Sequence, residues 1–97
     1  MIDLAAAERE IVQAILRRHV PDRAVVVFGS RAHGTAKPFS DLDLAILGET
    51  PLSLSTLTEL ADAFTESDLR FKVDIVDWAS TSEPFRKIIE QSAVPIQ

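Results

Sequence analysis

Two aspartates, Asp41 and Asp43, stand two positions apart at the start of an apolar segment that is expected to form a strand over residues 41–47. Side chains alternate between the two faces of a strand, so both carboxylates are expected to point to the same side. Two neighbouring carboxylates repel each other, and a bound cation relieves that repulsion. The pair therefore predicts a metal site.

A glycine–serine turn, Gly29-Ser30, is separated from Asp41 by ten residues and follows an expected strand at residues 24–28. Gly29 permits a sharp turn, and Ser30 is expected to cap a short helical stretch that Gly34 ends. The first backbone N–H groups of such a stretch are unpaired and bind phosphate oxygens. A phosphate cradle beside a carboxylate pair indicates a site for a metal-bound nucleotide.

A third aspartate lies in the segment 71–77, which reads as another strand. Alternation places two sets of side chains on opposite faces, Phe71, Val73 and Ile75 on one and Lys72, Asp74 and Val76 on the other. Asp74 interrupts an otherwise apolar strand and so needs a functional explanation. Asp77 falls on the opposite face or beyond the strand end, which favours Asp74 as the third carboxylate.

The spacing of Gly29-Ser30 and Asp41-x-Asp43 resembles the signature of the polymerase-β-like nucleotidyltransferases. The short length and the stretch GSRAHG…SDLDLAIL resemble the minimal nucleotidyltransferases (MNT) that are paired with HEPN-domain toxins in prokaryotic toxin–antitoxin operons. This resemblance extends over residues 25–78. One departure is His33, which occupies a position where related sequences often carry arginine, and it bears on how tightly the triphosphate is gripped.

The resemblance implies a magnesium-dependent protein adenylyltransferase that acts as an antitoxin. Such a protein would transfer AMP from ATP to a hydroxyl, expected to be a tyrosine, of a cognate HEPN RNase toxin in a hetero-oligomer. The sequence contains no tyrosine of its own, so tyrosine modification would occur in trans. Two rival readings stay open: neutralisation of the toxin by sequestration alone, and transfer to a small molecule. The second ranks last because an acceptor-binding lobe is missing.

The resemblance also implies roles for individual residues. Two Mg²⁺ ions about 3.5–4 Å apart would clamp the attacking and leaving oxygens, and carboxylates are suitable ligands for them. Asp41 and Asp43 would bridge both ions, and Asp74 would complete the ion beside the nucleophile. The residues implied to hold ATP are Gly29, Ser30 and Arg31, the arginine through charge-assisted contacts.

The order of the expected elements predicts an α/β fold in which a small mixed sheet is flanked by helices, as a single domain over residues 1–97. The resemblance implies that this fold is the core of a polymerase-β-like nucleotidyltransferase. Asp3 is expected to cap a helix that runs to His19, and Ser53 or Ser55 to begin another that ends near Ser67. A last helix is expected after Thr81 or Ser82. The tail 94–96 is expected to pack back on the domain or to join a partner.

Composition narrows the possible partners. Hydrophobic residues make up 46% and charged residues 26%, as in globular proteins, and there is no cysteine for disulfides or thiolate metal sites. A net charge of −5 argues against a broad surface for nucleic acid, so no direct nucleic-acid partner is expected. The apolar runs are too short to span a membrane and there is no signal-peptide pattern, so a cytoplasmic location and no contact with a membrane are expected.

Overall fold

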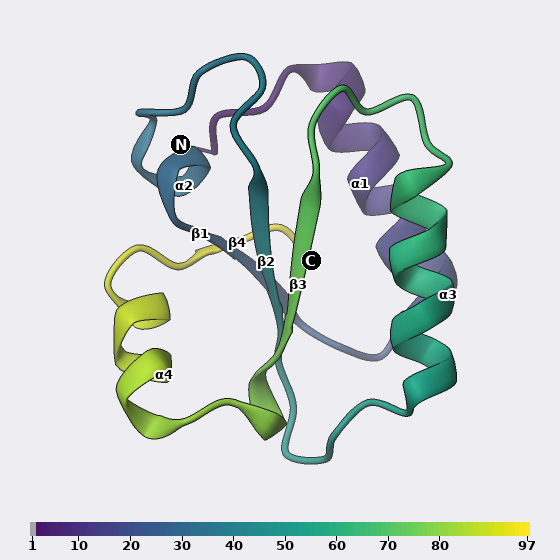
Figure 1. Ribbon diagram of the computed structural model, residues 1–97, viewed down its shortest axis with the longest axis vertical. Helices are drawn as coiled ribbons and strands as arrows, with labels where there is room; N and C mark the ends of the chain where they lie inside the picture. Colours follow the sequence, from purple (N-terminus) through teal and green to yellow (C-terminus); the bar gives the residue numbers. More distant parts are fainter. Residues whose placement is uncertain (1) are drawn as a thin grey trace.

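The computed structural model describes residues 2–97, whose four strands form one mixed sheet in the order β3-β2-β1-β4 (Figure 1). The elements are α1 (Ala6–His19), β1 (Val25–Phe28), α2 (Ser30–His33), β2 (Leu42–Ile46), α3 (Leu54–Thr65), β3 (Val73–Asp77), a 3-10 turn (Trp78–Ser80), α4 (Glu83–Glu90) and β4 (Val94–Pro95). A mixed sheet between helices confirms the predicted fold class.

The sheet topology brings the starts of β2 and β3 side by side. β1 and β2 are antiparallel, and β2 and β3 are parallel because α3 returns the chain between them. β4 pairs antiparallel with β1 through the register Val26↔Pro95 and Val27↔Val94. The tail therefore packs back on the domain, which confirms the first of the two alternatives predicted for it.

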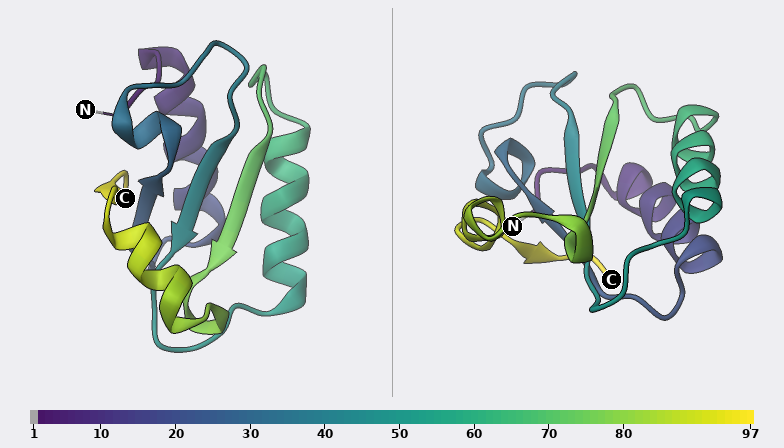
Figure 2. Two further views of the ribbon diagram at one scale, coloured as in Figure 1. Left: turned by 60° about the vertical axis from the view of Figure 1, so that its left-hand side comes forward. Right: turned by 60° about the horizontal axis from the view of Figure 1, so that its bottom comes forward.

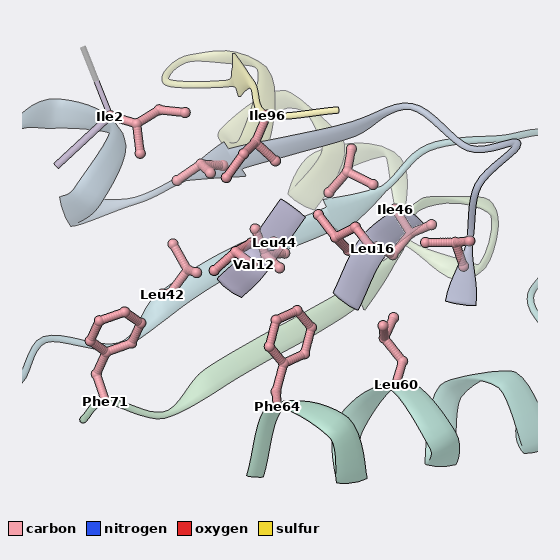
Figure 3. Close-up of a cluster of buried hydrophobic side chains, with 13 residues drawn as sticks. Ile2, Val12, Leu16, Leu42, Leu44, Ile46, Leu60, Phe64, Phe71 and Ile96 are labelled. Atoms are coloured by element: carbon pink, nitrogen blue, oxygen red, sulfur yellow. The ribbon is translucent and has the colours of Figure 1, made fainter. Parts of the chain in front are cut away.

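The two faces of the sheet carry separate groups of helices, with α1 and α3 on one side and α4 on the other (Figure 2). The larger core lies under α1 and α3, where Leu42, Leu44 and Ile46 of β2 meet side chains of both helices (Figure 3). The smaller core lies under α4 and comprises Val26, Phe28, Ala45 and Ile89. β1 is buried on both faces, which explains its uninterrupted apolar run.

Several helix details differ from the sequence prediction. The helix α1 begins at Ala6 rather than after Asp3, and the Glu8 carboxylate accepts the N–H of Ala5 at 2.8 Å. The apolar pattern of this segment predicts that Ile11 and Ile15 face the core, but the fully buried residues are Val12 and Leu16, and Ile11 and Ile15 are half-buried.

The cap of α3 is confirmed, because the Ser53 hydroxyl accepts the N–H of Thr56 at 3.1 Å. The apolar pattern of this helix predicts that Leu54 is buried, and this prediction is wrong, since 79% of the residue is exposed. Ser82 caps α4 in the same way, through the N–H of Phe85. No helix within residues 2–97 is long and apolar enough to cross a membrane.

Candidate active site

Asp43 and Asp74 lie at the same level of the two parallel strands β2 and β3, as Cα partners in the register. Paired residues of neighbouring strands share a face, so both side chains lie on the side of the sheet opposite α1 and α3. Asp41 is exposed and directly precedes β2. Figure 1 shows α4 near the lower ends of these strands, whereas the aspartates lie at the starts, beyond the part that α4 covers.

The electrostatics of Asp43 show that the three carboxylates influence one another. Burial raises the pKa of the Asp43 carboxyl above its usual value, and the negative charges of Asp74 and then Asp41 raise this pKa further. A cation bound among these groups would relieve both effects. The other two aspartates selected from the sequence therefore lie close enough to Asp43 for their charges to raise its pKa.

Asp74 has a competing partner in the structure. Its Oδ1 lies 3.2 Å from the Lys72 Nζ, and 72% of the lysine side chain and 41% of the aspartate side chain are exposed. Within residues 2–97, no three acidic, histidine or cysteine side chains converge closely enough to hold a metal ion as they stand. An exposed ion pair of this kind is worth at most about 1 kcal/mol, so a cation can compete with Lys72 for the carboxylate.

Gly29 begins the turn that is expected to bind phosphate, and it lies directly against the carboxylate of Asp43. Its φ of 76° and ψ of −152° are accessible to glycine alone, and a Cβ at this position would lie 2.6 Å from Asp43 Oδ2. Gly29 is also the N-cap of α2, with no side-chain cap, so the expectation that Ser30 caps this helix is wrong. Ser30 is instead its first residue, and Gly34 ends it in the left-handed conformation with φ of 74°.

The backbone N–H of Gly29 is held by a residue that sequence reasoning missed. The Ser92 hydroxyl accepts this N–H at 3.1 Å, across 63 positions of sequence. Ser92 lies between α4 and β4, so the link ties the end of α4 to the turn. A lone serine in a tail carries no local signal of this role, which depends on α4 returning to the sheet.

Arg31 occupies a different place from the phosphate contact that the resemblance implied. It is 4% exposed, and its guanidinium lies over the ring of Phe71, 3.9 Å from the centroid. Its nitrogens donate to the carbonyls of Asp3 at 2.8 Å, Ser40 at 3.0 Å and Pro38 at 3.2 Å. Arg31 thus fastens the N-terminal segment and the loop before Asp41 to α2, so three of its donors are used within the protein.

Asp77 serves the opposite end of β3. Its Oδ2 accepts the N–H of Leu52 at 3.0 Å and the Ser80 hydroxyl at 3.1 Å, which holds the connection between β2 and α3. The register pairs Asp77 with Ile46, three levels away from the pair of Asp43 and Asp74. The geometry therefore separates Asp77 from the site, in agreement with the alternation that favoured Asp74.

Comparison with known protein families identifies the family to which the chain belongs. The model of the polymerase beta nucleotidyltransferase family matches residues 10–96. The chain belongs to this family. As a polymerase beta nucleotidyltransferase, it places its Gly-Ser turn and its Asp-x-Asp pair at the end of the sheet that α4 leaves uncovered.

Two relatives of this nucleotidyltransferase are both named as protein adenylyltransferases. A protein of Haemophilus influenzae named as the protein adenylyltransferase MntA is 51% identical over 96 residues, which are 99% of this chain and 84% of the relative. A protein of Methanocaldococcus jannaschii, also named as a protein adenylyltransferase, is 30% identical over 93 residues, 88% of this chain and 94% of the relative.

Solved structures give the same assignment for this nucleotidyltransferase. A crystal structure of a toxin–antitoxin with AMP-PNP has a TM-score of 0.78 and 28% identity, and the match covers 92% of this chain and 72% of that one. A structure described as a minimal nucleotidyltransferase has a TM-score of 0.70 and 36% identity, with 92% and 89% covered. The fold of this nucleotidyltransferase is therefore that of a minimal nucleotidyltransferase.

The donors at this site fit magnesium. Asp41, Asp43 and Asp74 supply only hard carboxylate oxygens, the ligand type that magnesium prefers. The raised pKa of Asp43 is the signature of a carboxylate that lacks a compensating charge in the protein. The structure thus places the Asp43 carboxylate, whose pKa the charges of Asp74 and Asp41 raise, against the glycine–serine turn.

Proposed function

We propose that this chain is an antitoxin that transfers AMP from ATP to a hydroxyl of a cognate HEPN-domain toxin, with tyrosine as the acceptor. One observation carries the proposal: the Gly29 turn packs against the carboxylate of Asp43, level with Asp74 on the next strand. The first residue of the turn proposed to bind phosphate is thus a direct neighbour of a carboxylate proposed to bind metal. The 51% identity to a protein named as an adenylyltransferase and the match to a toxin–antitoxin with AMP-PNP support this assignment.

The proposed reaction is an in-line exchange at the α-phosphorus of ATP. The acceptor oxygen forms a bond to this phosphorus, the bond to the oxygen that bridges to the β-phosphate breaks, and pyrophosphate leaves with that electron pair. The hydroxyl proton passes to a carboxylate oxygen of Asp74, which is exposed enough to meet an acceptor. The backbone N–H groups and the hydroxyl of Ser30 hold the triphosphate.

The magnesium sites belong to the proposal and are assigned from the donor set. Asp41 and Asp43 would hold two Mg²⁺ ions, and Asp74 would hold the ion nearer the acceptor after it exchanges Lys72 for the cation. When bound, these ions supply the positive charge that neutralises the phosphates and activates the attacking hydroxyl. A cytoplasmic location stays a prediction.

An acceptor outside the chain is required if tyrosine is modified, because residues 1–97 contain none. The test is intact-mass spectrometry of the protein and its co-purifying partner after incubation with ATP and Mg²⁺. We expect one or more additions of AMP mass on the partner and none on this chain. The control is the double variant Asp41→Asn/Asp43→Asn, which should still bind the partner but add nothing.

The other outcomes separate the rival functions. A stable partner that gains no mass with the wild-type protein would favour neutralisation by sequestration. A partner-free protein that adenylylates a free alcohol would favour a small-molecule acceptor. Additions of equal number with the double variant would show that the aspartates are not the catalytic groups.

A further inference from the structure

The proposed triphosphate cradle has few donors left once the contacts within the protein are counted. α2 is a single turn, in which the N–H groups of Ala32 and His33 both bond the Gly29 carbonyl. The Arg31 guanidinium is committed to three carbonyls, and the Gly29 N–H to Ser92. Within the described residues, the unbonded donors of this turn are the N–H groups of Ser30 and Arg31 and the Ser30 hydroxyl.

Ser92 brings a further donor to the same turn. Its hydroxyl oxygen accepts the Gly29 N–H at 3.1 Å, and a serine hydroxyl also has one hydrogen to donate. That hydrogen takes no part in the bond to Gly29, so the hydroxyl can donate it to another group. The α-carbon of Gly29, on the other side of the same residue, faces Asp43. The Ser92 hydroxyl therefore binds the same residue, Gly29, that packs against the Asp43 carboxylate.

We propose that Ser92 is a nucleotide-binding residue whose hydroxyl donates to a phosphate oxygen of the bound nucleoside triphosphate while it accepts the Gly29 N–H. This inference rests on the proposed function, since it adds a contact to the same nucleotide site. The arrangement couples the end of α4 to the nucleotide, because phosphate binding would bridge Ser30 on α2 and Ser92 beyond α4.

A matched pair of substitutions isolates the donated bond. Asparagine and aspartate at position 92 are nearly isosteric, and both offer an oxygen to the Gly29 N–H. Only asparagine can also donate, whereas aspartate places a negative charge against the phosphates. We expect Ser92→Asp to weaken the binding of AMP-PNP with Mg²⁺ by about tenfold or more, and Ser92→Asn by about threefold or less.

The probe is AMP-PNP titrated by calorimetry into the wild-type protein and each variant, with thermal unfolding to confirm the fold. Ser53→Asp adds the same charge at the cap of α3, far from the site, and should leave binding unchanged. Equal weakening by Ser92→Asp and Ser92→Asn would overturn the inference and leave Ser92 a tether for Gly29. If the wild-type protein itself fails to bind AMP-PNP, the proposed function fails first.

Discussion

The α-carbon of Gly29 packs against the carboxylate of Asp43, so closely that a Cβ would lie 2.6 Å from Oδ2. This contact joins the two halves of the proposed site, because the turn that we propose to bind phosphate and the strand that carries Asp43 have no room between them. It also explains why the position must be glycine for two separate reasons, the backbone conformation and the space.

The contact predicts that Gly29→Ala abolishes transfer by displacing the Asp43 carboxylate. We expect a loss of AMP transfer of about 100-fold or more, since a displacement of about 1 Å at reacting groups costs that much. Gly34→Ala is the matched control: its φ of 74° is also positive, but nothing lies within 4 Å of its Cβ. That variant should lose about 1–2 kcal/mol of stability and keep most of its transfer rate. Similar losses in both variants would contradict the close contact.

The raised pKa of Asp43 predicts that its charge destabilises the fold when no cation is present. Between the usual aspartate pKa and the raised value, the folded state binds more protons than the unfolded state, so stability falls as pH rises through this window. At neutral pH without Mg²⁺, Asp43→Asn should therefore raise the unfolding temperature by on the order of a few degrees. The same variant should lose transfer.

Measured unfolding curves at several pH values check this sign. The advantage of Asp43→Asn should vanish below the window, where the wild-type carboxyl is protonated in both states. Asp62→Asn, on the exposed face of α3, should give no such pH-dependent difference. An unfolding temperature that falls in Asp43→Asn at neutral pH would show that the Asp43 carboxylate stabilises the fold.

The charge of Asp74 raises the pKa of Asp43 more than the charge of Asp41 does, and titration of the Asp43 carboxyl can test this order. Asp74→Asn should lower the pKa of the Asp43 carboxyl more than Asp41→Asn does, because Asp74 is the larger of the two charge effects. Carbon-detected NMR of the side-chain carboxyl follows this titration residue by residue. Equal shifts, or none, would mean that Asp43 and Asp74 do not face each other across the strands.

The ion pair between Lys72 and Asp74 predicts a competition between lysine and magnesium. Lys72→Gln removes the competitor, so half-maximal transfer should need less Mg²⁺, by up to about fivefold, the equivalent of an exposed ion pair. Lys87→Gln on α4 removes an equal charge away from Asp74 and serves as the control. An unchanged magnesium requirement would argue against Asp74 as a ligand.

The strand aspartates were predictable because their positions follow from local rules. Alternation along residues 42–46 and 73–77 fixes the faces of Asp43 and Asp74, and a crossover through α3 makes the two strands parallel. The spacing of the glycine–serine turn and the aspartates is equally local, so the resemblance could be recognised without the structure.

The rest could not be predicted, since it depends on contacts made only in the folded chain. Two apolar stripes run along α1, Ile11 with Ile15 and Val12 with Leu16, and packing alone decides that the second is buried. An arginine beside a phosphate turn suggests a phosphate contact, but Arg31 finds carbonyls from segments 7 and 28 residues away. Ser92 reaches Gly29 only because the chain returns after α4.

The buried guanidinium of Arg31 predicts a large and specific cost of replacement by lysine. A lysine ammonium is a compact charge that cannot reach three diverging carbonyls and also lie flat over Phe71. We expect Arg31→Lys to lower the free energy of unfolding by about 2–4 kcal/mol, measured by urea denaturation. Arg70 is exposed and lines the same cavity as Arg31 and residues 36–39. The variant Arg70→Lys should change the free energy of unfolding by no more than about 0.5 kcal/mol.

A second readout distinguishes the positioning of Asp41 from stability alone. The Ser40 carbonyl that Arg31 holds directly precedes Asp41, so a loosened loop should lower the maximal transfer rate of Arg31→Lys at temperatures where the variant is still folded. Saturating ATP should not restore this rate, because the defect lies in the carboxylate and not in phosphate binding. A variant that regains the full rate when ATP is raised would instead place Arg31 among the nucleotide contacts, as the resemblance first implied.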